Sequence, residues 1–107
     1  MFKVNLTPTF THPVTVCVPV DGGFREDKCK ATFRVLPAED LGMGDAQISQ
    51  VESVRRILVN MEELEGDDGQ PMAWSDELRD QLIAVPYVRA ALIQTYLAAV
   101  TKTRVGN

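Results

Sequence analysis

The stretch Val14-Thr15-Val16-Cys17-Val18-Pro19-Val20 decides the fold, because it places a valine at every second position. Successive side chains of a β-strand point to opposite faces, so this alternation predicts a strand with one apolar face. Proline has no amide hydrogen to donate to a ladder, and Pro19 therefore places the strand at a sheet edge or frays its end. The first part of the chain is expected to be β-structure.

A second strand is expected after the turn signal Asp21-Gly22-Gly23. Apolar residues alternate along it up to the break at Pro37, and they are Cys29, Ala31, Phe33 and Val35. The two stretches predict an antiparallel hairpin whose loop is longer than the tight two-residue kind. The segment Phe2–Phe10 also alternates and is expected to add a third strand, limited in length by Pro8 and Pro13.

A change of period marks the start of the helical part. Residues 38–46 are polar and contain Gly42 and Gly44, so they are expected to form a loop, and Asp45 can cap the helix that follows. The apolar residues of that helix recur at spacings of three and four, and they are Ile48, Val51, Val54, Leu58 and Met61. This spacing predicts an amphipathic helix over residues 48–61.

An acidic turn is expected next. Five acids fall within seven positions: Glu62, Glu63, Glu65, Asp67 and Asp68. The Asp68-Gly69 pair and Pro71 are turn signals. A calcium loop read from Glu63 needs glycine at its sixth position and glutamate at its twelfth, where this chain has Asp68 and Trp74. The pattern therefore favours a solvated acidic turn over a metal site.

Two further helices are expected after the acidic turn. Ser75 is a suitable N-cap for a short helix, and Pro86 suits the first position of a long helix that runs to Val100. The long helix is apolar nearly all round, which is typical of a helix covered on every side. A small domain rarely covers such a helix completely, so a partner or a second copy is expected to cover the rest.

Length and composition limit the possible classes of protein. The chain has 107 residues, which fits a single α+β domain with a β part at 1–41 and a three-helix part at 42–107. It has 11 basic and 15 acidic residues, a net charge of −4, which argues against binding nucleic acid or anionic membranes. It lacks both a long apolar run and the layout of a signal peptide, so a cytosolic location is expected.

The residues that usually carry catalysis are scarce. His12 is the single histidine, and the two cysteines are Cys17 and Cys29, too few ligands for a usual zinc site. A catalytic pair of Cys17 and His12 lacks an evident orienting group. We therefore expect no enzyme activity, no cofactor and no bound metal. The two cysteines could face each other across the hairpin, so both a disulfide and free thiols remain open.

Six residues are candidates for a partner or oligomer interface: Trp74, Tyr87, Ile93, Tyr96, Leu97 and Val100. Trp74 is either a core anchor or a partner-facing aromatic, since tryptophan and tyrosine are common in binding hot spots. Tyr87 and Tyr96 are nine residues apart on one helix and point about 180° apart, so at least one lies at the edge of the core or outside it. A homo-oligomer through the last helix is expected, with Tyr96 or Leu97 at its seam.

The second half of the chain resembles a family. The resemblance rests first on the acidic turn, which ends in Asp-Asp-Gly-Gln-Pro at 67–71, and on the segment Ala-Trp-Ser-Asp-Glu-Leu at 73–78. It also rests on a helix with the pattern Pro-x-Val-Arg-Ala-Ala-Leu-x-x-x-Tyr at 86–96 and on the final residues Gly106-Asn107. With the valine-rich hairpin before them, these features resemble the tail assembly chaperones of long-tailed bacteriophages and prophages. The resemblance covers about residues 14–107 and rests largely on helix-packing residues.

The resemblance implies a non-enzymatic role. Such chaperones bind the tape-measure protein, keep its apolar helices soluble and promote assembly of tail-tube protein around it. They act in the host bacterial cytoplasm and are absent from the mature virion. The alternative is a small acidic regulatory module of a phage or bacterium that inhibits a host protein by mimicking nucleic acid. The acidic turn motivates that alternative, although five acids are few for such mimicry.

Overall fold

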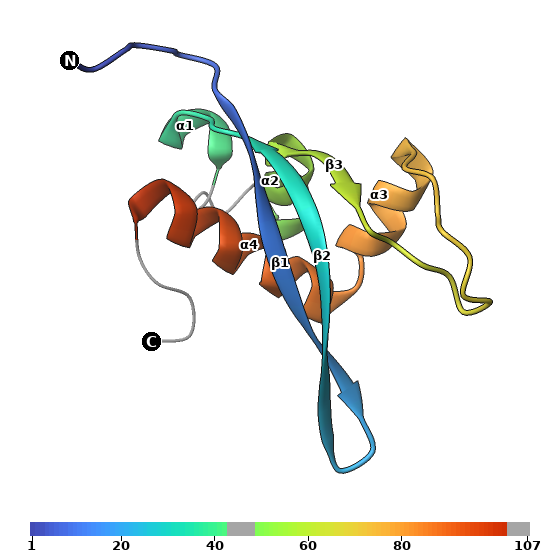
Figure 1. The fold of residues 1–107 in the computed structure, drawn as a ribbon. Helices are drawn as coiled ribbons and strands as arrows, with labels where there is room; N and C mark the ends of the chain where they lie inside the picture. The colour runs from blue at the N-terminus through green and yellow to red at the C-terminus, as the bar shows by residue number, and fades with distance from the viewer. Residues whose placement is uncertain (43–48, 103–107) are drawn as a thin grey trace.

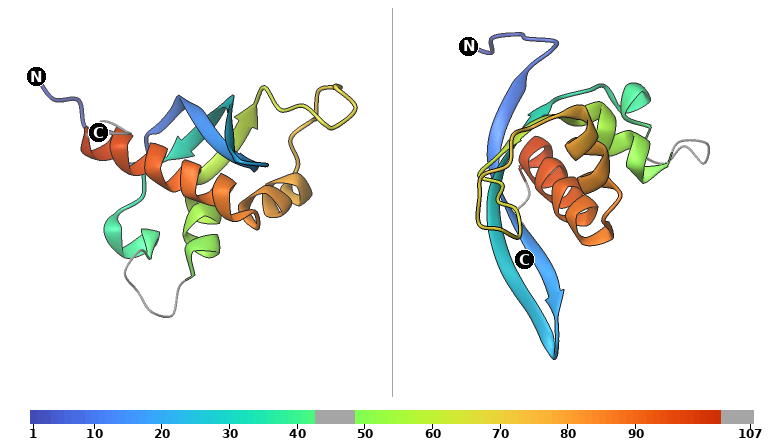
Figure 2. Two further views of the ribbon diagram at one scale, coloured as in Figure 1. Left: turned by 90° about the horizontal axis from the view of Figure 1, so that it is seen from below. Right: turned by 90° about the vertical axis from the view of Figure 1, so that its right-hand side faces the viewer.

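The computed structural model describes residues 1–42 and 49–102. It has a three-stranded antiparallel sheet in the order β1-β2-β3, together with helices that mostly follow in the chain (Figure 1). The expected α+β class is therefore confirmed. The helices lie against one face of the sheet, and the other face is open, as the side view in Figure 2 shows.

The hairpin is longer than the sequence predicted, and its loop is tighter. Strand β1 spans Thr9–Val20 and strand β2 spans Gly23–Arg34, and they pair over their full length. Val20 pairs with Gly23, so the loop has two residues and the expectation of a longer loop was wrong. Gly22 has a φ of 79°, which favours glycine because it has no Cβ. On β2 the ladder continues through charged residues near the tip, where that strand shows no apolar alternation.

The two faces of the hairpin differ in chemistry. The residues buried on its inner face, beneath the helices, are Val14, Val16, Cys29, Ala31 and Phe33. The outer face is polar, and there the hydroxyls of Thr11 and Thr32 lie 2.8 Å apart in a cross-strand hydrogen bond. The alternation in the sequence therefore predicted the buried residues beneath the helices correctly, whereas Val20 of the same predicted face is 44% exposed at the tip.

The third strand comes from a different segment than predicted. Strand β3 spans Leu58–Glu62 and pairs antiparallel with β2, whereas the sequence predicted that Leu58 and Met61 belong to a helix. The register shifts opposite Thr32 and Phe33, which is a β-bulge. Because of the extra residue, Leu58 and Met61 are both buried although they are three positions apart. The bulge thus gives two buried residues the three-residue spacing that is typical of one face of a helix.

The N-terminal segment does not form the expected third strand. Within Phe2–Phe10, only Thr9 and Phe10 belong to a strand, and that strand is β1. Pro13 lies inside β1, which is tolerated because β1 is an edge strand. Residues 1–8 form an arm, with a bend at Leu6 and Thr7, that leaves the body of the molecule at the end opposite the hairpin tip (Figure 1). We call these residues the N-terminal arm.

The first helix was not predicted, and the second is shorter than its pattern suggested. Helix α1 spans Ala38–Leu41, within the segment expected to be a loop. Helix α2 spans Gln50–Ile57 and begins at Ser49, whose hydroxyl accepts a hydrogen bond from the Glu52 amide. The expected cap at Asp45, the loop residue Gly44 and the apolar position Ile48 lie outside the described residues. The strand β3 follows α2 directly, so the part of the chain expected to be helical also completes the sheet.

The last two helices begin where the sequence predicted. Helix α3 spans Asp76–Ile83, and the Ser75 hydroxyl accepts a hydrogen bond from the Leu78 amide as its N-cap. Helix α4 spans Pro86–Thr101, with the proline in its first turn. The Arg89 guanidinium donates a hydrogen bond of 2.8 Å to the Ile83 carbonyl, a group left without a helical partner at the end of α3. This contact stabilises the sharp corner between the two helices.

The core lies between the inner face of the sheet and the helices. Its largest fully buried side chains are Val14, Phe33, Ser53, Val54, Ile57, Ile83, Leu92 and Tyr96. They come from both strands of the hairpin and from α2, α3 and α4, so the sheet and the helical part share one core. The distal part of the hairpin extends beyond this core, and the longest dimension of the molecule is 45 Å.

Candidate functional site

An apolar stripe runs along the outer side of α4. Its residues are Ala90, Ile93, Leu97 and Val100, at spacings of three, four and three. Leu97 and Val100 are 38% and 40% exposed, Ala90 is exposed, and Ile93 is half-buried at the inner margin. This spacing is the one by which a helix presents a seam to another helix. We call these four residues the α4 stripe.

Tyr96 does not belong to that surface, which corrects its assignment to an interface. It is 1% exposed and lies on the opposite, inner side of α4 with Val88, Ala91 and Leu92. Its hydroxyl accepts a hydrogen bond of 3.3 Å from the Leu36 amide. Its ring lies 5.6 Å from that of Phe33. The helical period placed Tyr96 and Tyr87 on opposite sides correctly, but it did not say which side was the core.

The remaining candidates lie toward the other end of the helical part. Tyr87, in the first turn of α4, is 38% exposed, whereas Trp74 is half-buried and packs against the core. The six candidates therefore do not form one site. Ile93, Leu97 and Val100 form a continuous stripe, and Tyr87 lines a separate groove near the start of the same helix.

That groove is a feature that sequence reasoning missed. It lies between the distal hairpin, the acidic turn and the start of α4, and its volume is about 770 Å³. Its apolar lining residues are Val16, Val18, Met61, Leu64, Leu82, Tyr87 and Val88. The signal in the sequence was the valine alternation, which continues past the part of the hairpin that the helices cover. We call this feature the hairpin groove.

The rim of the hairpin groove is predominantly acidic. Its charged lining residues are Arg25, Glu26, Asp27, Lys28, Glu63, Glu65 and Asp67, five acids against two bases. Arg25 binds both carboxylate oxygens of Asp27, at 2.8 and 2.9 Å, and this hydrogen bonding lowers the pKa of Asp27. Of the two bases, Arg25 is thus already paired with an acid. A ligand of this groove should be apolar and basic.

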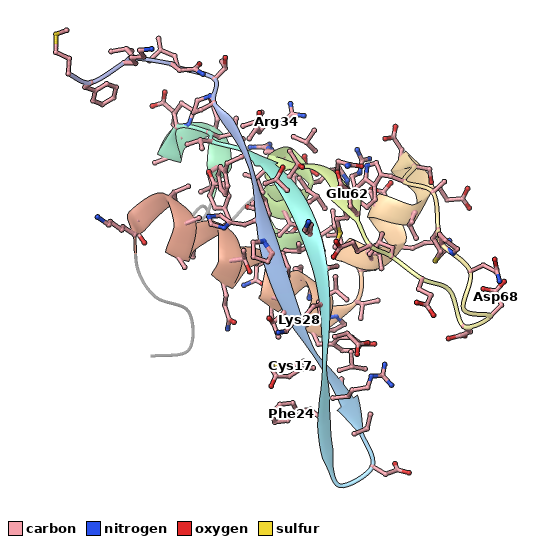
Figure 3. The ribbon with its side chains drawn as sticks, in the orientation of Figure 1. Cys17, Phe24, Lys28, Arg34, Glu62 and Asp68 are labelled. Carbon is pink, nitrogen blue, oxygen red and sulfur yellow. The ribbon has the colours of Figure 1, made fainter. Side chains whose placement is uncertain are left out.

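The acidic turn forms as expected and is well structured. The Gly69 amide donates to the Gly66 carbonyl at 2.9 Å, and the Met72 amide donates to the Leu64 carbonyl at 2.9 Å. The five acids of the turn are all exposed. Glu63 lies 3.4 Å from the Lys30 ammonium, which joins the start of the turn to β2. Figure 3 shows Asp68 on a protrusion well separated from the hairpin tip near Phe24.

The structure separates the residues considered for catalysis. Cys17 lies on the outer face of β1, whereas His12 lies five residues away on a strand position of the other parity, so the two side chains point to opposite faces. Cys17 pairs with Glu26 and Cys29 pairs with Val14, and both cysteines are free thiols. Within the described residues, no group of three or more histidine, cysteine or acidic side chains could hold a metal ion.

The described helices do not have the length of a straight membrane span. Taken singly, none of the helices in residues 1–42 and 49–102 is long and apolar enough to cross a bilayer. Helices α3 and α4 together reach the required length and composition, but they bend by 97° at the break between them. Val88, Leu92 and Ile83 in this pair are buried in the core described above.

Comparison with known proteins returns nothing: no family model, curated protein or solved structure matches the chain. Two features of the chain's surface stand out: the α4 stripe and the acid-rimmed hairpin groove.

Proposed function

We propose that this chain is a non-enzymatic tail assembly chaperone that binds helical segments of a phage tape-measure protein along the α4 stripe. The observation that carries the proposal is the exposed apolar seam on a helix whose other side is buried in the core. A client helix with its own apolar seam has matching geometry, because side chains at spacings of three and four interlock between two helices.

The stripe suits temporary binding. Burying a Leu or Val side chain completely contributes about 1.5–3 kcal/mol, and Leu97 and Val100 are already more than half covered, so each adds about 1 kcal/mol. A few such contacts per copy bind weakly, and many copies along a long client still cover its apolar surface. Weak individual contacts also allow release when tail-tube protein polymerises around the client.

Charge supports the same role. The net charge of −4 and the exposed acidic turn keep a complex with an apolar client in solution, because like-charged complexes repel one another. We place this activity in the host bacterial cytoplasm, with tape-measure and tail-tube proteins as partners and with release before the virion is complete. Without a client, the α4 stripe is also a surface through which copies would associate.

Co-expression with a tape-measure fragment tests the proposal. The Leu97→Ser/Val100→Ser variant removes the most exposed apolar side chains of the stripe without touching the core. We expect the soluble fraction of the fragment to fall to nearly the level seen without the chaperone. Val20→Ser is the matched control, because Val20 is 44% exposed but lies at the hairpin tip, and this variant should solubilise the fragment like the wild type.

Two results would contradict the proposal. The first is a fragment whose solubility does not depend on the chaperone at all. The second is a Leu97→Ser/Val100→Ser variant that folds normally and solubilises the fragment as well as the wild type. The circular dichroism spectrum and melting temperature of each variant establish that it is folded before its activity is compared.

A further inference from the structure

The N-terminal arm has the pattern of a strand but lies away from the sheet. Phe2, Val4 and Leu6 alternate with polar residues, and they are 84%, 74% and 82% exposed. In Figure 1 the arm extends from the start of β1 away from the rest of the molecule. Such a row of large apolar side chains on one face of an extended segment is stabilised when it joins a sheet over an apolar surface.

A sheet edge that could accept a strand lies beside the hairpin groove. Strand β3 pairs with β2 only as far as Lys30, which lies opposite Glu62. Within the described residues, the rest of β2, from Gly23 to Cys29, pairs with β1 alone. Its second edge therefore presents backbone N–H and C=O groups without a neighbouring strand, which is the usual template for adding one.

We propose that the N-terminal arm of one copy adds as an antiparallel strand to this edge of β2 in a second copy. Phe2, Val4 and Leu6 then lie over the hairpin groove, on the same face of the sheet as its apolar lining residues Val16 and Val18, with β2 between them. The charge of this edge suits the occupant, because Lys3, the charged side chain of residues 1–8, is basic and Glu26 on β2 is acidic. The proposal concerns self-association and is independent of client binding by the α4 stripe.

The charges of Lys3, Glu26 and Lys28 favour one pairing register of the N-terminal arm on β2. With the apolar residues turned inward, Lys3 points to the outer face, where the outward residues of β2 near the tip are Phe24, Glu26 and Lys28. Opposite charges on directly paired residues are favourable and like charges are unfavourable, so Lys3 pairs with Glu26 and not with Lys28. This register places Leu6 opposite Gly23.

Chain geometry requires the strand to come from another copy. Gly23 lies eleven positions along β2 from Arg34, the residue that pairs with Thr9, and at about 3.3 Å per residue this is roughly 36 Å. Leu6 is three residues from Thr9 and reaches at most about 11 Å from it. The arm therefore cannot place Leu6 beside Gly23 of its own chain, whereas the arm of a neighbouring molecule has no such limit.

A charge swap tests the pairing directly. Lys3 and Glu26 are both exposed, so substituting them does not disturb the core. In sedimentation equilibrium, Lys3→Glu and Glu26→Lys should each weaken self-association about fivefold or more, because each puts like charges opposite one another. The double variant K3E/E26K restores opposite charges and should associate nearly as the wild type does. A wild-type chain that stays monomeric at high concentration overturns the proposal, as does a double variant that remains weak.

Two apolar variants separate this contact from association through α4. Phe2→Ser/Leu6→Ser should remove the association through β2 and leave at most the weaker association through the α4 stripe, whereas Leu97→Ser should leave the arm contact intact. The opposite outcome, with association lost in Leu97→Ser and kept in Phe2→Ser/Leu6→Ser, overturns the proposal. Because neither arm substitution touches the α4 stripe, solubilisation of a tape-measure fragment by the arm variant reports separately on the proposed function.

The place of contact can be read by NMR. A chain of natural isotopic abundance carries a nitroxide at Asn5→Cys in a Cys17→Ser background, and it is mixed with wild-type chain labelled with nitrogen-15. Only contacts between molecules broaden the labelled signals. We expect broadening at the amides from Phe24 to Lys28 and around the acidic turn. Broadening confined to α4, or no broadening at associating concentrations, overturns the proposal.

Discussion

Tyr96 connects three parts of the molecule through one side chain. Its ring contacts Phe10 of β1 and Phe33 of β2, with centroids 6.2 and 5.6 Å away, and its hydroxyl accepts the Leu36 amide hydrogen. A buried tyrosine hydroxyl normally has such a partner, because an unpaired polar group costs free energy in the core. Tyr96 therefore fixes α4 against both the hairpin and the chain that leaves it.

Tyr96→Phe isolates the hydrogen bond from the packing of the ring. The variant keeps the ring and leaves the half-buried Leu36 amide without this acceptor, so we expect the free energy of unfolding to fall by about 1 kcal/mol. Urea denaturation measures the change, with the slope against denaturant unchanged. Tyr87→Phe is the matched control, since Tyr87 is 38% exposed, and it should change stability little. Equal effects of the two substitutions would contradict the role assigned to Tyr96.

The two cysteines should react at different rates. Burial raises the pKa of the Cys29 thiol, and the nearby carboxylates of Glu63 and Asp27 raise it further, so less of the reactive thiolate is present. Cys17 is exposed. With Ellman's reagent at mildly alkaline pH, one thiol should react promptly and the second only slowly or on unfolding. In a Cys17→Ser variant the prompt phase should disappear; its persistence would show that Cys29 is accessible.

At the scale of elements, Asp80 joins α2 to α3. Its carboxylate accepts hydrogen bonds from Arg79 of its own helix and from Arg55 of α2, each at 3.1 Å. These two hydrogen bonds, that from Arg79 first, lower the pKa of Asp80 below its ordinary value of 3.8. Asp80 is exposed to solvent, so the contribution of these ion pairs to stability is small and is reduced by salt.

The sign of the pH dependence follows from that lowered pKa. A carboxylate with a lower pKa in the folded state stabilises the fold above its unfolded pKa, and the contribution is lost as pH falls through the folded value. We therefore expect Asp80→Asn to melt at a lower temperature than the wild type near neutral pH. The two melting temperatures should converge at pH values well below 3.8. If the difference in melting temperature between the wild type and Asp80→Asn stayed constant down to that pH, the destabilisation would not come from ionisation of Asp80.

Sequence patterns predicted some elements well because one local rule governs each of them. Ser75 caps α3 and Pro86 opens α4, and both signals act within a single turn. Strand β3 was missed because its bulge places Leu58 and Met61 three positions apart on one face, as a helix would. A bulge is defined by how a strand pairs with its neighbour, and the sequence of the strand alone does not show that pairing.

The candidate site was partly predictable for the same reason. The helical period groups Ile93, Leu97 and Val100 on one side of α4, and the structure keeps them together. The same period cannot say which side meets the sheet, and so Tyr96 was assigned to the surface. The hairpin groove was not predictable, because it brings together segments far apart in the chain, from Val16 to Tyr87.

At the scale of the whole molecule, the core supports only part of the hairpin. The proximal part, near Phe33 and Val14, is buried beneath the helices, and β3 pairs with it. The distal part, around Val20 and Phe24, has exposed side chains and a single neighbouring strand within the described residues. Local stability should therefore fall along the hairpin from the core to the tip.

Native-state hydrogen exchange measures this gradient. Amides between Lys30 and Phe33 and in the buried side of α4 should exchange only through global unfolding, which for a domain of this size costs about 5–15 kcal/mol. Amides around Phe24 should exchange through local opening at a much smaller cost, because no apolar layer covers them. Uniform protection along β2 in the monomer would contradict this reasoning. Protection near Phe24 that appears only as protein concentration rises would instead show that the distal edge gains a strand on association.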